Sequence, residues 1–322
     1  MLNNYVLITD FPENTDSLLS LLLVANLHKQ KLIDLKGVVV NRNRNYRVVE
    51  RANIARWFLD NLGLEEITVG IGDECQEEYL STSGKLDSES CKPRLDFYRR
   101  QKTKAMVLWN HLRSYNQKIH FISVSPLVDL AKAMPMLVNR VESVTFSGSM
   151  QQINGMIIPD LNSQNVKSGL IKLSEGQGVW DTTQDVFDLA MERSIDFRTV
   201  SETINGQTAL NYKDLFAPLV HSNSPIHRYI ESKASTELGL SPESELSKGE
   251  SFQGSIPIPK LLTTMFSIPR LRSAWFIPKR LYAVNGFVEM ADGVESISSV
   301  KFPHLLIKAL PGLLFPDLLG LY

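Results

Sequence analysis

Short apolar runs alternate with helix-patterned segments through the first 200 residues. Runs rich in Val, Ile, Leu and Phe predict strands at residues 5–9, 35–40, 67–71, 119–124, 141–146 and 197–200. Apolar residues at helical spacing predict helices over 18–27, 46–62 and 126–136. Gly63 is placed to end the second of these helices.

This alternation predicts an α/β fold with an open, mostly parallel sheet flanked by helices on both faces. The predicted strands are continuously apolar, as expected of strands that are buried on both faces. In such sheets, ligands bind at the carboxyl ends of the strands. Functional side chains are therefore expected just after residues 9, 40, 124 and 147. We expect one domain over residues 1–322, with loop insertions near 73–92, 155–178 and 241–254.

Composition narrows the classes of function. The 322 residues contain 34 Lys plus Arg against 35 Asp plus Glu, so the chain lacks the cationic surplus of a nucleic-acid-binding protein. The apolar run at 18–27 is too short to span a membrane, which needs about 20 residues, and it follows acidic residues instead of the basic start of a signal peptide. Cys75 and Cys91 are too few for a disulfide framework and suit a reducing compartment. We expect a soluble cytoplasmic protein that uses neither nucleic acid nor membrane.

Three carboxylates gather in the turn after the first predicted strand. Asp10, Glu13 and Asp16 could chelate a hard divalent cation such as Ca²⁺ and position a water on it. The alternative is structural, with Asp16 or Thr15 capping the following helix and Glu13 solvated. Spacing alone favours the structural interpretation.

Other segments favour the metal-site interpretation of these carboxylates over the structural one. The relevant motifs are Thr9-Asp10 with Asp16 six residues on, Gly37-Val-Val-Val followed by Glu50-Arg-Ala-Asn53, Thr68-Val-Gly-Ile-Gly72, Ser123-Val-Ser-Pro126-Leu-Val-Asp-Leu-Ala131, and Val144-Thr-Phe-Ser-Gly148. In this order and spacing, over about residues 4–154, the chain resembles the inosine–uridine preferring nucleoside hydrolase family, as a divergent member. The resemblance continues more weakly to Val200.

The resemblance implies a calcium site and a catalytic aspartate. Asp10 matches the family's catalytic, metal-binding aspartate, and Asp16 matches its second metal-binding aspartate. The backbone carbonyl of Val124 matches a further metal ligand. Thr15 stands where the family has a carboxylate that holds ribose hydroxyls. Asn285 is the best placement for the late aspartate ligand of the family's His-Asp pair, which has no clean match in this sequence.

Substrate-binding positions are partly kept and partly lost. Asn154 matches the asparagine that follows the family's Gly-Gly end. Asp181 falls on the asparagine of the ribose clamp, whose glutamate is replaced by Val179. The asparagine after the second strand falls on Arg44, although a shift of one residue would restore an asparagine there.

The basic residues Arg42, Arg44, Arg47 and Arg51 are interpreted as a solvated helix face. Arg42 and Arg44 are the exception, because they follow a strand at the expected ligand edge. There they could meet an anionic group of a substrate.

These matches lead to a first hypothesis, that a Ca²⁺-activated water cleaves the N-glycosidic bond of a nucleoside or related N-riboside. The lost histidine would have supplied a general acid, which is worth about 10²–10⁴-fold in rate. The second hypothesis is therefore a catalytically inactive member that acts as a ligand-binding or protein-interaction module. A third is hydrolysis of an anionic riboside recognised by Arg42 or Arg44. The resemblance also implies a homodimer or homotetramer.

Overall fold

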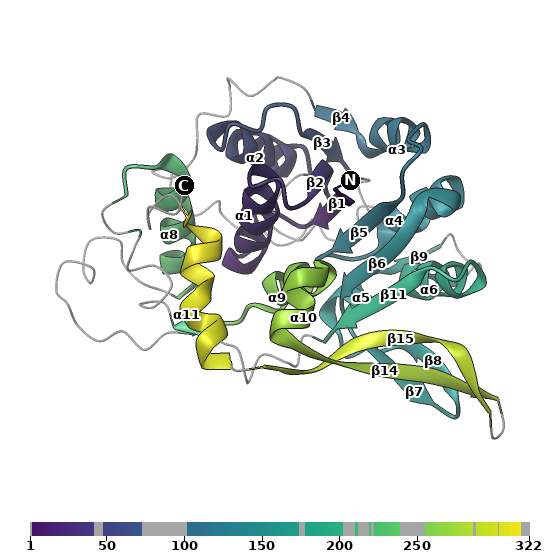
Figure 1. The fold of residues 1–322 in the computed structure, drawn as a ribbon. Helices are drawn as coiled ribbons and strands as arrows, with labels where there is room; N and C mark the ends of the chain where they lie inside the picture. The colour runs from purple at the N-terminus through teal and green to yellow at the C-terminus, as the bar shows by residue number, and fades with distance from the viewer. Residues whose placement is uncertain are drawn as a thin grey trace.

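A nine-stranded sheet forms the centre of the protein (Figure 1). The computed structural model describes residues 2–41, 48–72, 102–173, 178–201, 210–211, 219, 222–238, 255–285, 288–301 and 303–316. In order across the sheet, the strands are β14 (Phe276–Asn285), β15 (Val288–Val300), β11 (Asp196–Val200), β6 (Val141–Ser147), β5 (Ile119–Ser123), β1 (Asn4–Thr9), β2 (Asp34–Val40), β3 (Thr68–Ile71) and β4 (Lys102–Lys104).

The expected α/β fold and its mostly parallel sheet are confirmed. Strands β15 to β4 are paired in parallel, and only β14 runs antiparallel to its neighbour. The six strands predicted from apolar runs are β1, β2, β3, β5, β6 and β11. Because β11 pairs directly with β6, strands from before and after residue 150 belong to one sheet.

Alternate residues of the central strands face two different hydrophobic clusters. Tyr5 and Leu7 join the cluster of one face, and Val6 and Ile8 join that of the other, as the two-residue repeat of a strand requires. The first face is covered by α1 (Thr15–Lys29), α2 (Val48–Asn61), α8 (Pro225–Glu237), α9 (Pro259–Ser267), α10 (Pro269–Trp275) and α11 (Pro303–Leu314). The second is covered by α3 (Ala105–Arg113), α4 (Val128–Leu137) and α6 (Thr182–Glu192).

Some elements were not foreseen from the sequence. The long hairpin β14–β15 forms one end of the sheet (Figure 1). The stretch 155–178, expected as a loop insertion, contains β8 (Met156–Pro159), α5 (Gln164–Ser168) and β9 (Leu170–Lys172). Strand β8 pairs with β7 (Met150–Ile153), and β9 pairs with β10 (Val179–Asp181). The expected insertions near 73–92 and 241–254 lie outside the described residues.

The start of α1 explains how the turn after β1 is held. Asn14 is the N-cap, and its side-chain oxygen accepts a hydrogen bond from the backbone N–H of Ser17 at 2.9 Å. The hydroxyl of Ser17 lies 3.4 Å from the backbone nitrogen of Asn14, which completes a capping box. Asp16 therefore lies inside the first turn of α1 and is free for another role. In the described part of the chain, none of the helices is both long enough and apolar enough to cross a membrane.

Candidate functional site

Buried polar residues collect at the carboxyl edge of the sheet. Strands β6, β5, β1 and β2 are consecutive neighbours, so the segments that follow them meet at one edge. Asp10 follows β1, Asn41 follows β2, Ser125 lies just beyond β5, and Ser147 ends β6. Each of the four is at most 4 % exposed. The carboxyl edge of the sheet, which is predicted to bind a ligand, thus carries polar side chains that are buried.

Asp10 is paired with a lysine 250 positions later in the sequence. Both carboxylate oxygens of Asp10 accept hydrogen bonds from the Lys260 ammonium, with Nζ at 2.7 Å from Oδ1 and 2.5 Å from Oδ2. The Asp10 side chain is 4 % exposed and that of Lys260 is 10 % exposed. Burial on this scale is costly for either charge alone, so the two ions depend on each other.

Asp16 caps the helix that carries this lysine. Its Oδ2 accepts the backbone N–H of Lys260 at 2.7 Å, and its Oδ1 accepts that of Leu261 at 2.8 Å. Helix α9 begins with Pro259, which has no N–H, and its N-cap residue is Ile258, whose side chain cannot accept a hydrogen bond. Asp16 thus supplies from α1 the acceptor that the start of α9 lacks, and its negative charge suits a helix N-terminus.

The Asp16 carboxyl is buried deeply enough to change its protonation. Burial raises the pKa of Asp16 to about 7, although the hydrogen bonds and positive charge of Lys260 act in the opposite direction. At neutral pH, the Asp16 carboxyl is therefore protonated in part of the molecules and ionised in the rest.

Side chains of two further helices hold the turn between β1 and α1. Arg51 of α2 is fully buried and donates to the backbone carbonyl of Asp10 and to the Glu13 carboxylate, both at 2.5 Å. Glu237, the last residue of α8, accepts the backbone N–H of Thr15 at 2.8 Å. The turn is therefore tied to α2, α8 and α9 at once, and its conformation depends on all three helices.

Several buried polar atoms at this edge have no hydrogen-bond partner among the described residues. They are Thr15 Oγ1, Asn41 Oδ1, Ser125 Oγ and Ser147 Oγ. Buried polar groups are normally paired, and an unpaired one costs about 1–3 kcal/mol. Their position after neighbouring strands makes this edge a candidate site for a polar ligand.

The structure brings together part of the predicted site. Asp10, Asp16 and Thr15 lie in one turn, and the backbone N–H of Val124 donates to Ile8 in the strand that leads to that turn. The side chains of Asp10 and Asp16 both contact the first turn of α9.

Other predicted residues lie elsewhere. Asn154 is exposed in the turn between β7 and β8, where it and Gly155 both have positive φ. Asp181 caps α6 by accepting the N–H groups of Thr183 and Gln184. Asn285 is in the last pair of the β14–β15 hairpin. Arg44 lies outside the described residues. The binding roles of these four residues stay predictions.

These donors do not fit a divalent cation. Both oxygens of Asp10 are bound by an ammonium, and both oxygens of Asp16 are bound by backbone N–H groups. Across the described residues, His, Cys, Asp and Glu side chains form no cluster of three or more that could hold a metal. Ca²⁺ usually requires six to eight oxygen ligands.

Two charged residues of the site, Lys260 and Arg51, differ from what the sequence predicts. Lys260 follows Ile-Pro-Ile-Pro and precedes Leu-Leu, and a single charge in such an apolar segment is a signal that it has a buried partner. The helical pattern predicts a solvated position for Arg51, but its side chain is completely buried. The Asn-Gly pair at 154–155 is a hairpin signal, and it lies at the turn between β7 and β8 in the stretch predicted to be a loop.

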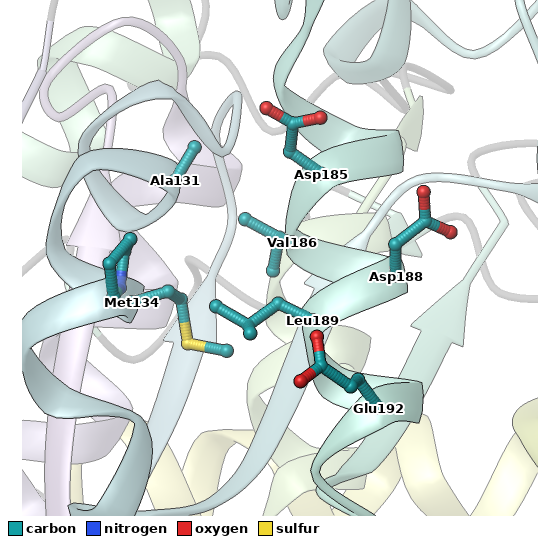
Figure 2. A pocket seen from close by; sticks show the side chains of 8 residues that line it. Ala131, Met134, Asp185, Val186, Asp188, Leu189 and Glu192 are labelled. Atoms are coloured by element: carbon teal, nitrogen blue, oxygen red, sulfur yellow. The ribbon is translucent and has the colours of Figure 1, made fainter.

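A second feature, on the other face of the sheet, is an acidic groove between α4 and α6. Figure 2 shows Asp185, Asp188 and Glu192 of α6 beside Ala131 and Met134 of α4. Asp185 accepts a hydrogen bond from the Trp180 indole and Asp188 accepts one from the Gln184 amide. The predicted site residues that the structure describes do not line this groove, so it is separate from the polar edge.

Comparison with known proteins identifies the fold. No protein-family model matches the chain, and no curated protein matches it in sequence. Solved structures do match along nearly its whole length. The type III effector protein XopQ, in a complex with adenosine diphosphate ribose, is 15 % identical with a TM-score of 0.74, covering 99 % of this chain and 95 % of XopQ.

Two other structures agree with this result. The effector protein XOO4466 is 16 % identical with a TM-score of 0.77, covering 99 % of this chain and 94 % of its own. The inosine–uridine preferring nucleoside hydrolase of Bacillus anthracis is 16 % identical with a TM-score of 0.61, covering 98 % and 99 % of the two chains. The resemblance inferred from the strand-end motifs is therefore confirmed at the level of the fold, which is that of the nucleoside hydrolases.

Proposed function

We propose that this protein binds a ribose-bearing small molecule at the carboxyl edge of its sheet and does not hydrolyse it. The fold is shared over almost the full chain with a protein whose structure contains adenosine diphosphate ribose. Fold alone does not fix activity, so the proposal depends on the chemistry of the edge itself.

The observation that carries the proposal is the engagement of both aspartates by the start of α9. A general base must reach the proton that it removes with a free lone pair. Asp10 is bound through both oxygens to the Lys260 ammonium, and Asp16 is bound through both oxygens to backbone N–H groups. Neither carboxylate is arranged to activate a water molecule, and the family's histidine acid has no match in the sequence.

The polar atoms at the edge support ligand binding. Thr15 Oγ1, Asn41 Oδ1, Ser125 Oγ and Ser147 Oγ are buried without partners in the described part of the chain. Hydroxyl groups of a ribose can donate to and accept from such atoms, and hydrogen bonds made in a buried site discriminate strongly between ligands.

Hydrolysis of an N-glycosidic bond with a Ca²⁺-activated water is the second candidate. Asp10 and Asp16 favour it, because they lie together in the turn to which the family resemblance assigns the metal site. This candidate requires that Lys260 release Asp10 when a metal or substrate binds.

Calorimetric titration with adenosine diphosphate ribose, inosine and uridine separates the two candidates. We expect saturable binding of at least one of these compounds and no release of base or ribose by chromatography, with or without added Ca²⁺. Turnover above the uncatalysed rate would establish the second candidate instead. Absence of binding to all three compounds would contradict the proposal.

Thr15→Val tests whether the ligand lies at this edge. The substitution nearly preserves volume and removes a buried hydroxyl that no described residue bonds, so the protein should remain folded. Loss of one hydrogen bond to the ligand should weaken binding about 5- to 10-fold, which corresponds to about 1–1.4 kcal/mol. Thr145→Val is the matched control, since Thr145 is equally buried and unpartnered but lies in the middle of β6. Equal affinities of the two variants would place the ligand elsewhere.

A further inference from the structure

The Lys260 ammonium has the position that a bound metal would take. A Ca²⁺ ion held by both oxygens of one carboxylate lies about 2.3–2.6 Å from each of them. Nζ of Lys260 lies 2.7 Å and 2.5 Å from the two oxygens of Asp10. Two cations cannot occupy the same place on one carboxylate, so lysine and metal exclude each other at Asp10.

The second aspartate is closed to a metal for a different reason. Its oxygens accept N–H groups that belong to the backbone of α9, at 2.7 Å and 2.8 Å. A metal could use these oxygens only if the first turn of α9 moved away. That turn is tightly packed, because Leu261 and Leu262 are completely buried in the hydrophobic cluster of this face.

The surrounding charges also disfavour a second cation. Arg51 is fully buried and donates to the backbone carbonyl of Asp10. The turn thus combines three carboxylates (Asp10, Glu13 and Asp16) with two buried cations, Arg51 and Lys260. Little negative charge is left to offset the dehydration of a divalent ion.

We propose that Lys260 is a built-in cation that replaces the divalent metal of the nucleoside-hydrolase fold, so that the carboxyl edge is assembled without Ca²⁺. The proposal goes beyond the proposed function, because it concerns the cation at Asp10 whether or not a riboside binds there. The charge of Asp10 is then neutralised by a side chain of the same protein, and the carboxyl edge does not depend on a supply of metal.

Calcium binding by the intact protein is the first test. Isothermal titration of metal-stripped wild-type protein with CaCl₂ into the millimolar range should give no binding heat. The Tm should be the same in Ca²⁺ and in EDTA. Stoichiometric binding, or a Tm that rises with Ca²⁺ concentration, would overturn the proposal, whatever the result of the riboside titrations.

Removing the lysine is the second test. In Lys260→Ala, Asp10 loses its cation and the space of the lysine side chain is vacated. The three carboxylates of the turn then face one buried cation, Arg51, instead of two, so Ca²⁺ can bind at Asp10 while Asp16 keeps its hydrogen bonds to α9. We expect a lower Tm in EDTA and a rise with added Ca²⁺ of about 5 °C at a hundredfold excess over the Kd. If the variant folds only when Ca²⁺ is present, the dependence of folded yield on Ca²⁺ provides the same evidence. A Lys260→Ala protein that ignores Ca²⁺ would contradict the proposal.

Three further variants separate this effect from general destabilisation. Lys260→Arg keeps a cation and should remain indifferent to Ca²⁺. Adding Asp10→Asn to Lys260→Ala should abolish the Ca²⁺ response, because the vacated ligand is then neutral. Lys36→Ala removes a lysine that pairs with Asp34 at 2.6 Å in a more exposed location, and it should show no Ca²⁺ response. A response of Lys36→Ala as large as that of Lys260→Ala would mean that Ca²⁺ acts non-specifically.

Discussion

The same sheet carries two clusters of charged residues, one buried at its carboxyl edge and one partly buried along β5, β6, β11 and β15. The edge cluster consists of Asp10, Asp16 and Lys260, and its contacts join β1 and α1 to a helix about 250 residues later in the chain. The strand cluster consists of His120, Ser143, Asp196, Arg198 and Glu295, which lie on β5, β6, β11 and β15.

The two clusters differ in how many oppositely charged side chains lie close to each buried carboxylate. Glu295 has three arginines within 4 Å, at 3.7 Å from Arg198, 3.5 Å from Arg272 and 3.8 Å from Arg280. The Asp10 carboxylate has one cationic side chain within salt-bridge distance among the described residues, Lys260. A network can redistribute its charges after a substitution, whereas an isolated buried pair cannot, so the edge should be the more sensitive of the two.

The largest effect is expected for Lys260→Met. Methionine has a similar length and leaves Asp10 buried without its cation, which should lower the free energy of unfolding by about 3–5 kcal/mol. Urea denaturation followed by circular dichroism measures this value. Lys36→Met is the control for a partly exposed pair and should cost less than about 1 kcal/mol.

A double-mutant cycle then assigns the loss to the pair. Adding Asp10→Asn to Lys260→Met removes the unpaired charge and should recover much of the lost stability. If the double variant were as unstable as the two single losses added together, Lys260 and Asp10 would not interact and the edge would not differ from the strand cluster.

A smaller effect is expected for Arg198→Met. The Arg198 side chain is 8 % exposed, but Asp196 is 38 % exposed and Glu295 keeps two other arginines. The remaining carboxylates are therefore solvated or paired, and the loss should be about 1–3 kcal/mol in the same denaturation assay. A loss larger than that of Lys260→Met would reverse the order of the two clusters.

The strands of the sheet and the aspartates of the edge cluster could be predicted from the sequence. The strands were predictable because continuous apolar runs such as Val38, Val39 and Val40 are typical of a sheet that is buried on both faces. Asp10 and Asp16 were found because two carboxylates close together after a strand are visible as a local pattern. The apolar runs and the pair of aspartates are both patterns formed by residues that are close together in the sequence.

Lys260 could not be found in the same way. Its partner is 250 positions away, and no local pattern specifies which loop will meet the start of α9. The burial of Arg51 is not predictable, because a helical arginine has the same sequence pattern whether it points to solvent or to a carbonyl of a distant segment such as Asp10. Burial of a charge is decided by tertiary packing, so a single sequence gives at most a hint, such as a lone lysine among prolines and leucines.

The smallest effect should come from the protonation of His120, which also distinguishes the clusters by the sign of their pH dependence. His120 stacks on Tyr5 with ring centroids 4.9 Å apart and is hydrogen-bonded through Nδ1 to the Ser143 hydroxyl at 2.8 Å. Burial lowers the pKa of His120, and the positive charges of Arg198 and Arg272 add to this, while Glu142 and Asp196 oppose it.

Because the unfolded chain takes up a proton at this histidine more readily than the native protein, stability should decline as the pH falls below about 6.5. The contribution of Asp16 to the pH dependence of stability has the opposite sign. Its pKa is raised from 3.8 to about 7, so the native protein holds the extra proton, and stability should decline as the pH rises from about 4 to about 7.

Denaturation of wild-type and His120→Gln proteins across pH 4.5–8 separates the two contributions. The variant should lose the decline below pH 6.5 and keep the fall toward pH 7 that comes from Asp16. Folding would then raise the pKa of a group in the edge cluster, Asp16, and lower the pKa of a group in the strand cluster, His120. If His120→Gln left the acid limb unchanged, the strand cluster would tolerate the imidazolium, and its network of arginines and carboxylates would be even more adaptable than the spacing around Glu295 implies.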